Sequence, residues 1–334
     1  MELGVHELAT MTATDQPEQT YDKVKDFVRA VESFNYKRYW FAEHHNVSNH
    51  ISSSPELMAA YMAAISEKIR VGTGGTMLMN YSPLKVAENF KTLTTLAPGR
   101  IDLGLGRAPG GGRAEIIALA QGHLDSIDDQ YGKIQVILDL LEDKKASGIY
   151  GATNASPQGT ATLPEPWMLG SSGQSALKAA QMGLGYSFAK FFGIATDPAV
   201  FQAYRDNFQA SQFFEKPSVM VSYMIVVGDS PEEADYLAKP LELNQIRLRQ
   251  GQMIRVQDPE SLIDYSFSPH EQAQIDKSYR ERFLIKGDMK QVESILSQEI
   301  EAYGIDEIMV YAPLFDYQDR VQSYRRLAQI FNKI

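Results

Sequence analysis

Eight short apolar runs that alternate with helical stretches predict an α/β fold, the (β/α)8 or TIM barrel. The 334 residues suit one such barrel, and no break in composition divides them, so we expect a single domain over residues 1–334. A doubly wound open sheet is the rival fold. It would place a Gly-rich turn after the first strand, and this sequence has none there.

The individual elements follow from the apolar runs and from proline placement. Proline stands at or near the start of several expected helices, where its missing N–H would be unsatisfied anyway. The expected strands cover residues 3–6, 39–42, 70–73, 101–105, 166–169, 185–189, 219–227 and 307–311. The expected helices cover residues 20–34, 55–65, 83–96, 126–141, 174–182, 198–212, 231–248, 289–303 and 319–331.

Two segments interrupt the alternation and are predicted as long insertions. Residues 144–165 are rich in Gly, Ser, Thr and Pro and follow strand four, and residues 249–283 precede the last βα unit. Loops of this length inside a compact domain are usually functional or disordered. The second segment carries apolar residues such as Met253 and Tyr265, so we expect a mobile lid over the barrel mouth. The alternative is a surface subdomain that packs permanently.

Composition excludes several classes of partner and chemistry. A formal net charge of −10 argues against a nucleic-acid partner or an anionic membrane surface. The absence of Cys removes disulfides, thiolate nucleophiles and Cys-ligated metals, and it fits a reducing compartment. The N-terminal stretch MELGVHELATMTATDQ has no signal-peptide pattern, and no apolar run is long enough to cross a membrane. We therefore expect a cytoplasmic protein.

Five motifs follow the second to sixth strands, the fifth of them FAKFFG (residues 188–193), and a barrel enzyme carries its active site at the ends of its strands. The first motif is Glu43-His44-His45, in a chain with only six histidines. Adjacent residues of a strand point in opposite directions, so His44 and His45 do not both face inward. A metal site would need three or four suitably spaced ligands, and none is expected here. Two interpretations of the histidine that faces inward remain: a structural residue or a proton-transfer group.

Three of the other motifs indicate a site for a flat, anionic ligand. GSSGQS, which opens the expected helix 174–182, presents backbone N–H groups and hydroxyls to an anion, although Ser172 could instead only cap the helix. Arg107, after the fourth strand, adds a charge suited to phosphate, or else forms a structural ion pair. GTGG after the third strand either allows close approach of a flat ligand or forms a plain tight turn.

Taken together, these stretches resemble the bacterial luciferase-like flavin monooxygenase family, and in particular its single-chain members. The resemblance rests on RYWFAEHH, RVGTGG…YSPLKVAENFKTLTTLAPGRIDLGLGRAPG, WMLGSSGQSALKAAQMGLGYSFAKF and GIDEIMVYAPLFDYQDRVQSYRRLAQI, and it covers nearly the whole chain. It implies a TIM barrel that binds reduced FMN and activates O2 at the flavin C4a position. His44 matches the family's active-site histidine, a proton donor or acceptor at the reactive flavin edge. Gly74 and Gly75 match a peptide, often cis, that lies against the isoalloxazine ring.

The resemblance also implies a phosphate site. Arg107, Ser172 and Ser175 match the family's phosphate ligands, and Ser171 and Gly173 are expected to offer backbone N–H groups.

The implied function is that of a two-component monooxygenase, which uses reduced FMN and O2 to oxygenate a small organic substrate. Nothing in the chain resembles a reductase domain, so a separate flavin reductase would supply reduced FMN, and a homodimer is expected. The alternatives are a deazaflavin-dependent hydride-transfer oxidoreductase and a non-catalytic flavin-binding protein. Gly106 replaces a reactive Cys of the catalytic luciferase subunit, and Lys190 stands where related oxidoreductases often carry His, which leaves the substrate contacts there open.

Overall fold

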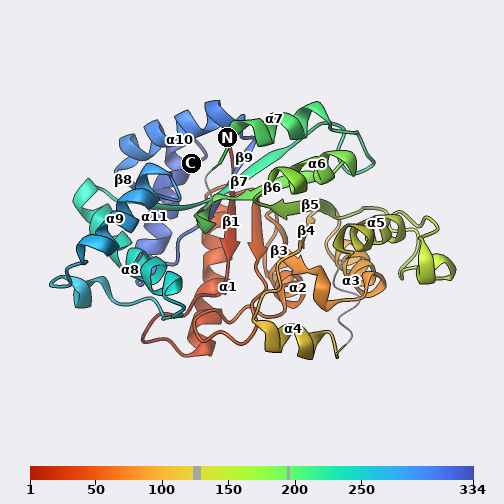
Figure 1. The fold of residues 1–334 in the computed structure, drawn as a ribbon, viewed down its shortest axis with the longest axis horizontal. Coiled ribbons are helices and arrows are strands. Elements are labelled where there is room, and N and C mark those ends of the chain that lie inside the picture. The colour runs from red at the N-terminus through yellow and green to blue at the C-terminus, as the bar shows by residue number, and fades with distance from the viewer. Residues whose placement is uncertain (123–128, 194–195) are drawn as a thin grey trace.

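Eight parallel strands close into a barrel in the computed structural model, which describes residues 1–122, 129–193 and 196–334 (Figure 1). The barrel strands pair in chain order, and β9 closes the ring by pairing with both β7 and β1. They are β1 (Glu2–Glu7), β2 (Arg38–Phe41), β3 (Arg70–Met77), β4 (Ile101–Gly106), β5 (Glu165–Gly170), β6 (Gly185–Ala189), β7 (Val219–Val227) and β9 (Glu307–Tyr311). The predicted fold class is confirmed, and each predicted strand lies within or overlaps an observed one.

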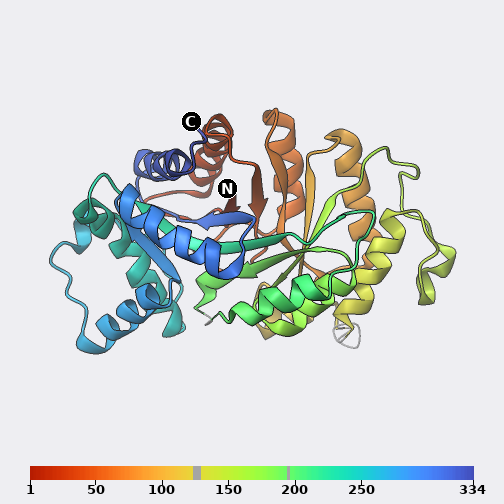
Figure 2. The same cartoon turned by 90° about the horizontal axis from the view of Figure 1, so that it is seen from above.

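The helices surround the barrel, as Figure 2 shows from above. They are α1 (Pro17–Ser33), α2 (Pro55–Ile65), α3 (Pro83–Leu96), α4 (Arg113–Leu119), α5 (Gln130–Leu141), α6 (Gly173–Gln181), α7 (Pro198–Asp206), α8 (Pro231–Arg249), α9 (Pro269–Arg280), α10 (Met289–Tyr303) and α11 (Tyr317–Ile330). Within the described ranges, every helix is too short or too polar to span a bilayer.

Two predicted helix boundaries need comment. The helix expected over residues 198–212 was predicted too long: α7 ends at Asp206, because the following chain turns back so that the Gln209 N–H donates to the Ala180 carbonyl of α6 at 2.9 Å. The helix expected over residues 126–141 is observed from Gln130 onward, and residues 123–128 lie outside the described part.

The two insertions extend from opposite ends of the molecule (Figures 1 and 2). The first runs from the end of α5 to β5 and contains only a short 3-10 helix, η3 (Gly148–Ala152). The second contains η5 (Pro259–Leu262) and α9, and it leads into β8 (Leu284–Gly287), which pairs with the C-terminal half of β7 outside the barrel. The sequence did not predict α4, α9 or β8, since α4 and β8 are short and α9 buries only Ile275 and Ser278.

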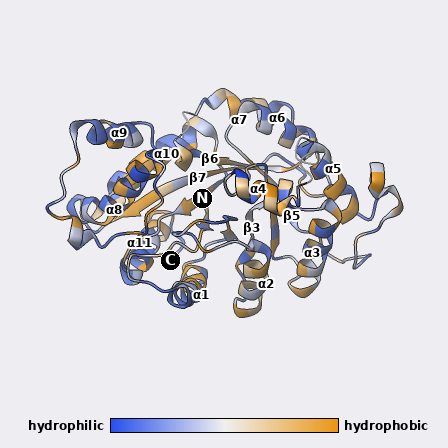
Figure 3. Ribbon diagram, turned by 60° about the horizontal axis from the view of Figure 1, so that its bottom comes forward, coloured by the Kyte–Doolittle hydropathy of each residue, from blue (hydrophilic) through white to orange (hydrophobic). Residues whose placement is uncertain are grey.

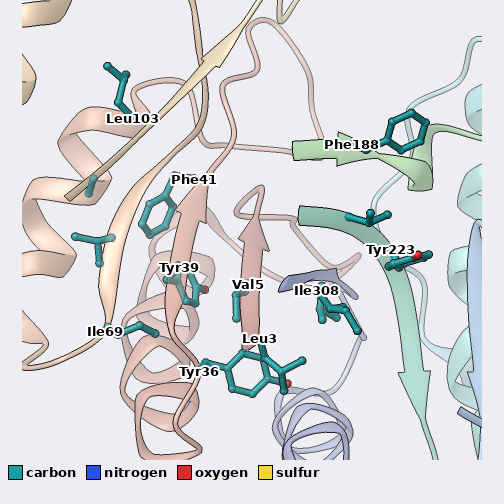
Figure 4. Close-up of a cluster of buried hydrophobic side chains, with 14 of the residues drawn as sticks. Leu3, Val5, Tyr36, Tyr39, Phe41, Ile69, Leu103, Phe188, Tyr223 and Ile308 are labelled. Carbon is teal, nitrogen blue, oxygen red and sulfur yellow. The ribbon is translucent and has the colours of Figure 1, made fainter. Parts of the chain in front are cut away.

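The main core lies between the outer face of the barrel and the helices. Alternate strand residues such as Leu3, Tyr39 and Tyr223 point into this layer and are fully buried (Figure 4). On the helix side, the Phe27 ring of α1 packs edge-on against Tyr324 of α11 at 4.9 Å. The buried strand β7 is drawn largely in the hydrophobic colour in Figure 3, whereas α11 is mostly hydrophilic because only one of its faces is buried.

The N-terminal end of the barrel interior is closed by a buried charge network around Arg38. Its guanidinium donates to Glu307 at 2.5 Å and to Asp102 at 2.6 Å, and all three side chains are almost completely buried. Burial alone would lower the pKa of Arg38, but the two carboxylates outweigh it and hold that pKa above its usual value. Above this layer, Trp40 and Trp167 pack edge-on at 5.8 Å, so the space left for a ligand lies at the opposite end of the barrel.

Candidate active site

A cavity of about 390 Å³ opens at the C-terminal ends of the strands, and we call it the main cavity. Each of the five motifs contributes to its wall: the lining includes His44, Gly74, Arg107, Ser171 and Phe191. The prediction that five loops separated in the sequence meet on one face is therefore confirmed. Barrel enzymes place their chemistry at this end, which makes the main cavity the candidate active site.

Glu43 fixes the loop that carries His44. Its fully buried carboxylate accepts hydrogen bonds from His45 Nε2 at 2.8 Å, the Met77 N–H at 2.9 Å, Asn80 Nδ2 at 3.0 Å and the Tyr81 hydroxyl at 2.9 Å. His45 is thereby held against Glu43, whereas His44 borders the main cavity. The two histidines diverge, as their adjacency in the sequence predicted.

His44 belongs to a cluster of three histidines that the sequence did not bring together. Its ring lies 5.2 Å from that of His50, and His6 borders the main cavity beside it. Burial, with smaller contributions from the neighbouring His6 and His45, lowers the pKa of His44 to about 4. Burial likewise lowers the pKa of His6 to about 4 and that of His50 to about 3. At neutral pH the cluster is uncharged, and His44 can accept a proton.

The strand-three glycines bring bare backbone to the cavity wall. The peptide between Gly74 and Gly75 is cis, and the Gly74 carbonyl accepts a hydrogen bond from His6 Nε2 at 2.6 Å. A Cβ atom on Gly74 would lie 3.1 Å from the Trp40 Cβ, and one on Gly75 would lie 2.8 Å from the Gly104 carbonyl oxygen. Gly75 therefore leaves no room for a side chain, a side chain at Gly74 would push against Trp40, and the wall at Gly74 presents bare backbone.

The opposite wall carries positive charge. The Arg107 guanidinium lies 4.7 Å from the centre of the Tyr131 ring, and within the described residues it forms no ion pair. Lys178 approaches the same ring at 5.8 Å. The Tyr131 hydroxyl is buried without a hydrogen-bond partner in the described part of the chain. The sequence gave no signal for Tyr131, which lies in the first turn of α5 and belongs to no motif.

The serines of GSSGQS divide into two groups. Ser171 and Ser172 line the main cavity, and Ser172 also caps α6 by accepting a hydrogen bond from the Ser175 N–H. Ser175 is buried, and its hydroxyl donates to the Ser172 carbonyl at 2.8 Å. Gly173 and Ser175 do not border the cavity. Helix capping is thus observed, and the phosphate-binding roles of these residues remain predictions.

Lys190 is not available as a substrate contact at the end of strand six. Its ammonium group is buried, pairs with Glu299 and lies 3.3 Å from the Tyr303 hydroxyl, so it points away from the barrel mouth. Phe191 and Phe192, which follow it, line the main cavity instead. The sequence comparison with oxidoreductases that carry His here had left this point open.

A second cavity of about 310 Å³, which we call the side chamber, adjoins the main cavity. The two share Leu8, His44, Phe191 and Phe192 as wall residues. His44 thus lies where a ligand in either cavity comes within its reach, and the pair of spaces suits a two-ligand reaction.

Comparison with known proteins agrees with this arrangement. The family model described as luciferase-like monooxygenase matches residues 1–319. The chain is 35% identical over 321 residues to the luciferase-like monooxygenase of Escherichia coli strain K12, covering 95% of this chain and 93% of that one. It is 30% identical over 308 residues to the N-acetyl-S-alkylcysteine monooxygenase of Bacillus subtilis strain 168, covering 89% of this chain and 88% of the relative.

Solved structures share the fold. The crystal structure of apo-MsnO8 superposes with a TM-score of 0.88 at 29% identity, and the alignment covers 100% of this chain and 99% of that one. The oxygenating constituent of 3,6-diketocamphane monooxygenase from Pseudomonas putida, solved with FMN, has a TM-score of 0.74 at 19% identity, over 100% and 98% of the two chains. An F420-dependent secondary alcohol dehydrogenase has a TM-score of 0.68 at 16% identity, over 98% of each chain. The last two likenesses concern the fold alone.

Proposed function

The chain belongs to the luciferase-like monooxygenase family, and on this premise we propose that it is a two-component FMN-dependent monooxygenase. Reduced FMN and O2 would oxygenate a small organic substrate, and a separate flavin reductase would supply the reduced FMN. The observation that carries the proposal is the main cavity, which is lined by a neutral histidine, His44, and by Arg107, which forms no ion pair within the described residues.

The residues of the main cavity fit FMN. Ser171 and Ser172, at the N-terminus of α6, would bind the phosphate together with Arg107, which follows β4. The N–H groups of the helix end and the guanidinium both favour an anion. The unpartnered Tyr131 hydroxyl, next to Arg107, offers a further donor. The bare backbone at Gly74 and Gly75 gives room for a flat ring.

When bound, reduced FMN would supply the electrons that activate O2, and the chain's own residues would manage protons and water. His44 is neutral at pH 7, so it can take a proton from the reacting partner and return it. Leu8, Phe191 and Phe192, between the two cavities, would exclude water from the reacting atoms.

The proposal is tested by titrating the protein with FMN and with F420 under anaerobic conditions. Isotopically heavy O2 is then admitted with a flavin reductase and a panel of small organic molecules. We expect tight binding of reduced FMN and one heavy oxygen atom in a product. Binding of F420 with no FMN binding would instead favour the hydride-transfer alternative, and FMN binding without O2 consumption would favour a non-catalytic flavin protein.

Replacing Arg107 by Ala is expected to weaken the binding of reduced FMN by about 1.5–3 kcal/mol, the range of a charge-assisted hydrogen bond. Anaerobic calorimetric titration measures the change. Arg113→Ala is the matched control, because Arg113 begins α4 and does not line the main cavity. Equal affinities for both variants would remove Arg107 from the phosphate site.

Residues 249–283 remain our candidate for a mobile lid, and the structure identifies the part that borders a ligand space. Residues 252–254 line the side chamber, and the chain is tied down just beyond them, where the Val256 N–H donates to the Met11 carbonyl at 3.1 Å. We expect trypsin to cut after Arg249 or Arg255 in the free protein, and bound reduced FMN to slow both cuts. Mass spectrometry of the fragments reports the rates, and cutting at the same speed with and without ligand would contradict the lid.

We also expect a homodimer, as the family resemblance implies. Leu57 and Tyr61, both on α2, are apolar side chains that are more than half exposed and would be covered by a second copy.

A further inference from the structure

The side chamber has no assigned ligand, and the residues that line it indicate which kind of molecule it could bind. It lies next to the main cavity, with His44 between the two. Its remaining walls come from α8, from residues 252–254 and from the ends of β7 and β9. If FMN occupies the main cavity, as proposed above, an organic molecule in the side chamber would lie next to the flavin, with His44 between the two.

Most of the wall is apolar. Met224, Leu241 and Phe283 are buried there, and no carboxylate borders the chamber within the described residues. A ligand of this space would therefore bury mainly hydrocarbon surface, which accounts for its affinity.

The chamber does not favour a charged ligand. His44 and His50 are neutral at pH 7, because burial lowers the pKa of the first to about 4 and of the second to about 3. Arg249 also borders the chamber, but its guanidinium donates to Gln274 Oε1 at 3.1 Å and to Ser278 Oγ at 3.3 Å, which ties α8 to α9. Arg249 is exposed, so solvent screens its charge, and a carboxylate brought into the apolar chamber would lose its water for a weak attraction only.

The side-chain oxygens of two asparagines in the wall accept no hydrogen bond from the described residues. Asn49 is 7% exposed, and its Nδ2 donates to the Ile254 carbonyl at 3.3 Å, an arrangement that leaves its Oδ1 without a partner. Asn244 of α8 also has a buried Oδ1 with no partner among the described residues. Buried polar atoms are almost always hydrogen-bonded, so two unpartnered acceptors in one apolar chamber mark where a ligand's donor belongs.

We propose that the side chamber binds the organic substrate of the oxygenation, and that this substrate is an uncharged molecule with an apolar body and a primary amide, whose two N–H groups can each donate a hydrogen bond. Asn244 and Asn49 accept hydrogen bonds from that group. The apolar body fills the space between Met224, Leu241 and Phe283. This inference rests on the proposed function, which fixes the main cavity as the FMN site.

The test uses three probes of equal chain length that differ only at one end: octanamide, methyl octanoate and octanoate. Each is titrated calorimetrically, in the absence of O2, into the full-length protein saturated with reduced FMN. We expect octanamide to bind at least about tenfold more tightly than the ester, which cannot donate, and than the carboxylate, which is charged. Asn244→Leu keeps a similar side-chain size and should abolish the preference for the amide. Gln250→Leu is the control, since Gln250 follows α8, is exposed and does not line the chamber.

The outcomes separate this inference from the proposed function. Amide preference in the parent protein and in Gln250→Leu, lost in Asn244→Leu with unchanged FMN affinity, supports the inference. Equal binding of amide and ester, tightest binding of octanoate, or binding of none of the three overturns it while leaving FMN binding intact. Failure of the protein to take up FMN is a different result, which removes the proposed function itself.

Discussion

Replacing His44 by Ala is expected to lower the rate of oxygenation by about 10²–10⁴-fold, the usual contribution of a general acid–base group. The protein should still fold and bind FMN, because in the described residues the buried Nδ1 of His44 makes no hydrogen bond that the substitution would break. The effect should fall on kcat, since the group would act on the reacting atoms, whereas the proposed phosphate site is formed by other residues, among them Arg107. Product formation under saturating reduced FMN and O2 measures it.

His45→Ala is the matched control for this variant. His45 is bonded to Glu43, which keeps three other donors when that bond is lost, so the loop should hold its place and turnover should fall far less. If His44→Ala and the parent protein form product at the same rate, His44 returns to a structural role.

Replacing Arg38 by Met is expected to lower the free energy of unfolding by about 3–5 kcal/mol, because it leaves the Asp102 and Glu307 carboxylates buried without their cation. Asp102 keeps Arg70 as a partner at 2.6 Å, whereas Glu307 keeps only the longer contact with Lys37 at 3.3 Å. Denaturant unfolding followed by tryptophan fluorescence reports the loss, since Trp40 donates directly to Asp102.

The control is Arg29→Met, which removes an exposed pair with Asp26 at 3.8 Å and should cost under about 1 kcal/mol. A similar midpoint for the Arg38 and Arg29 variants would mean that the buried network adds no more than a surface pair does.

The barrel and the general position of its site were predictable because both depend on local pattern. A few residues suffice to predict such elements. Strand β7 is an unbroken apolar run, and helix α3 begins at Pro83. The five motifs could be placed on one face because each follows a strand, and parallel strands of a barrel end together. The family resemblance is confirmed over residues 1–319.

What the sequence could not supply were contacts made across long distances in the chain. His6 meets the Gly74 carbonyl from 68 positions away, and neither residue carries a motif that points to the other. His50 belongs to none of the sequence motifs, and its ring contact with His44 depends on the course of the loop between them. Helix α9 has few apolar residues because most of its surface faces solvent, so it shows little of the periodicity that identified the other helices.

The histidine cluster at the barrel mouth also links folding to proton uptake. An unfolded chain holds its histidines near pKa 6.5, whereas in the folded protein burial holds the pKa of His6 and His44 to about 4 and that of His50 to about 3. Below pH 6.5 the unfolded chain therefore binds protons that the folded chain refuses, and stability falls as pH falls, by up to about 1.4 kcal/mol per pH unit for each histidine. Above pH 7 this contribution is constant.

Melting temperatures recorded between pH 7 and pH 5 should fall steeply, and His50→Leu should make the slope shallower by about one proton. A melting temperature that does not change over this interval would contradict the linkage. The burial that keeps His44 unprotonated at pH 7 thus also makes the folded protein bind protons less readily than the unfolded chain. Acid sensitivity and the proposed proton transfer therefore share one side chain, His44, whose burial keeps it neutral at pH 7 and destabilises the folded chain below pH 6.5.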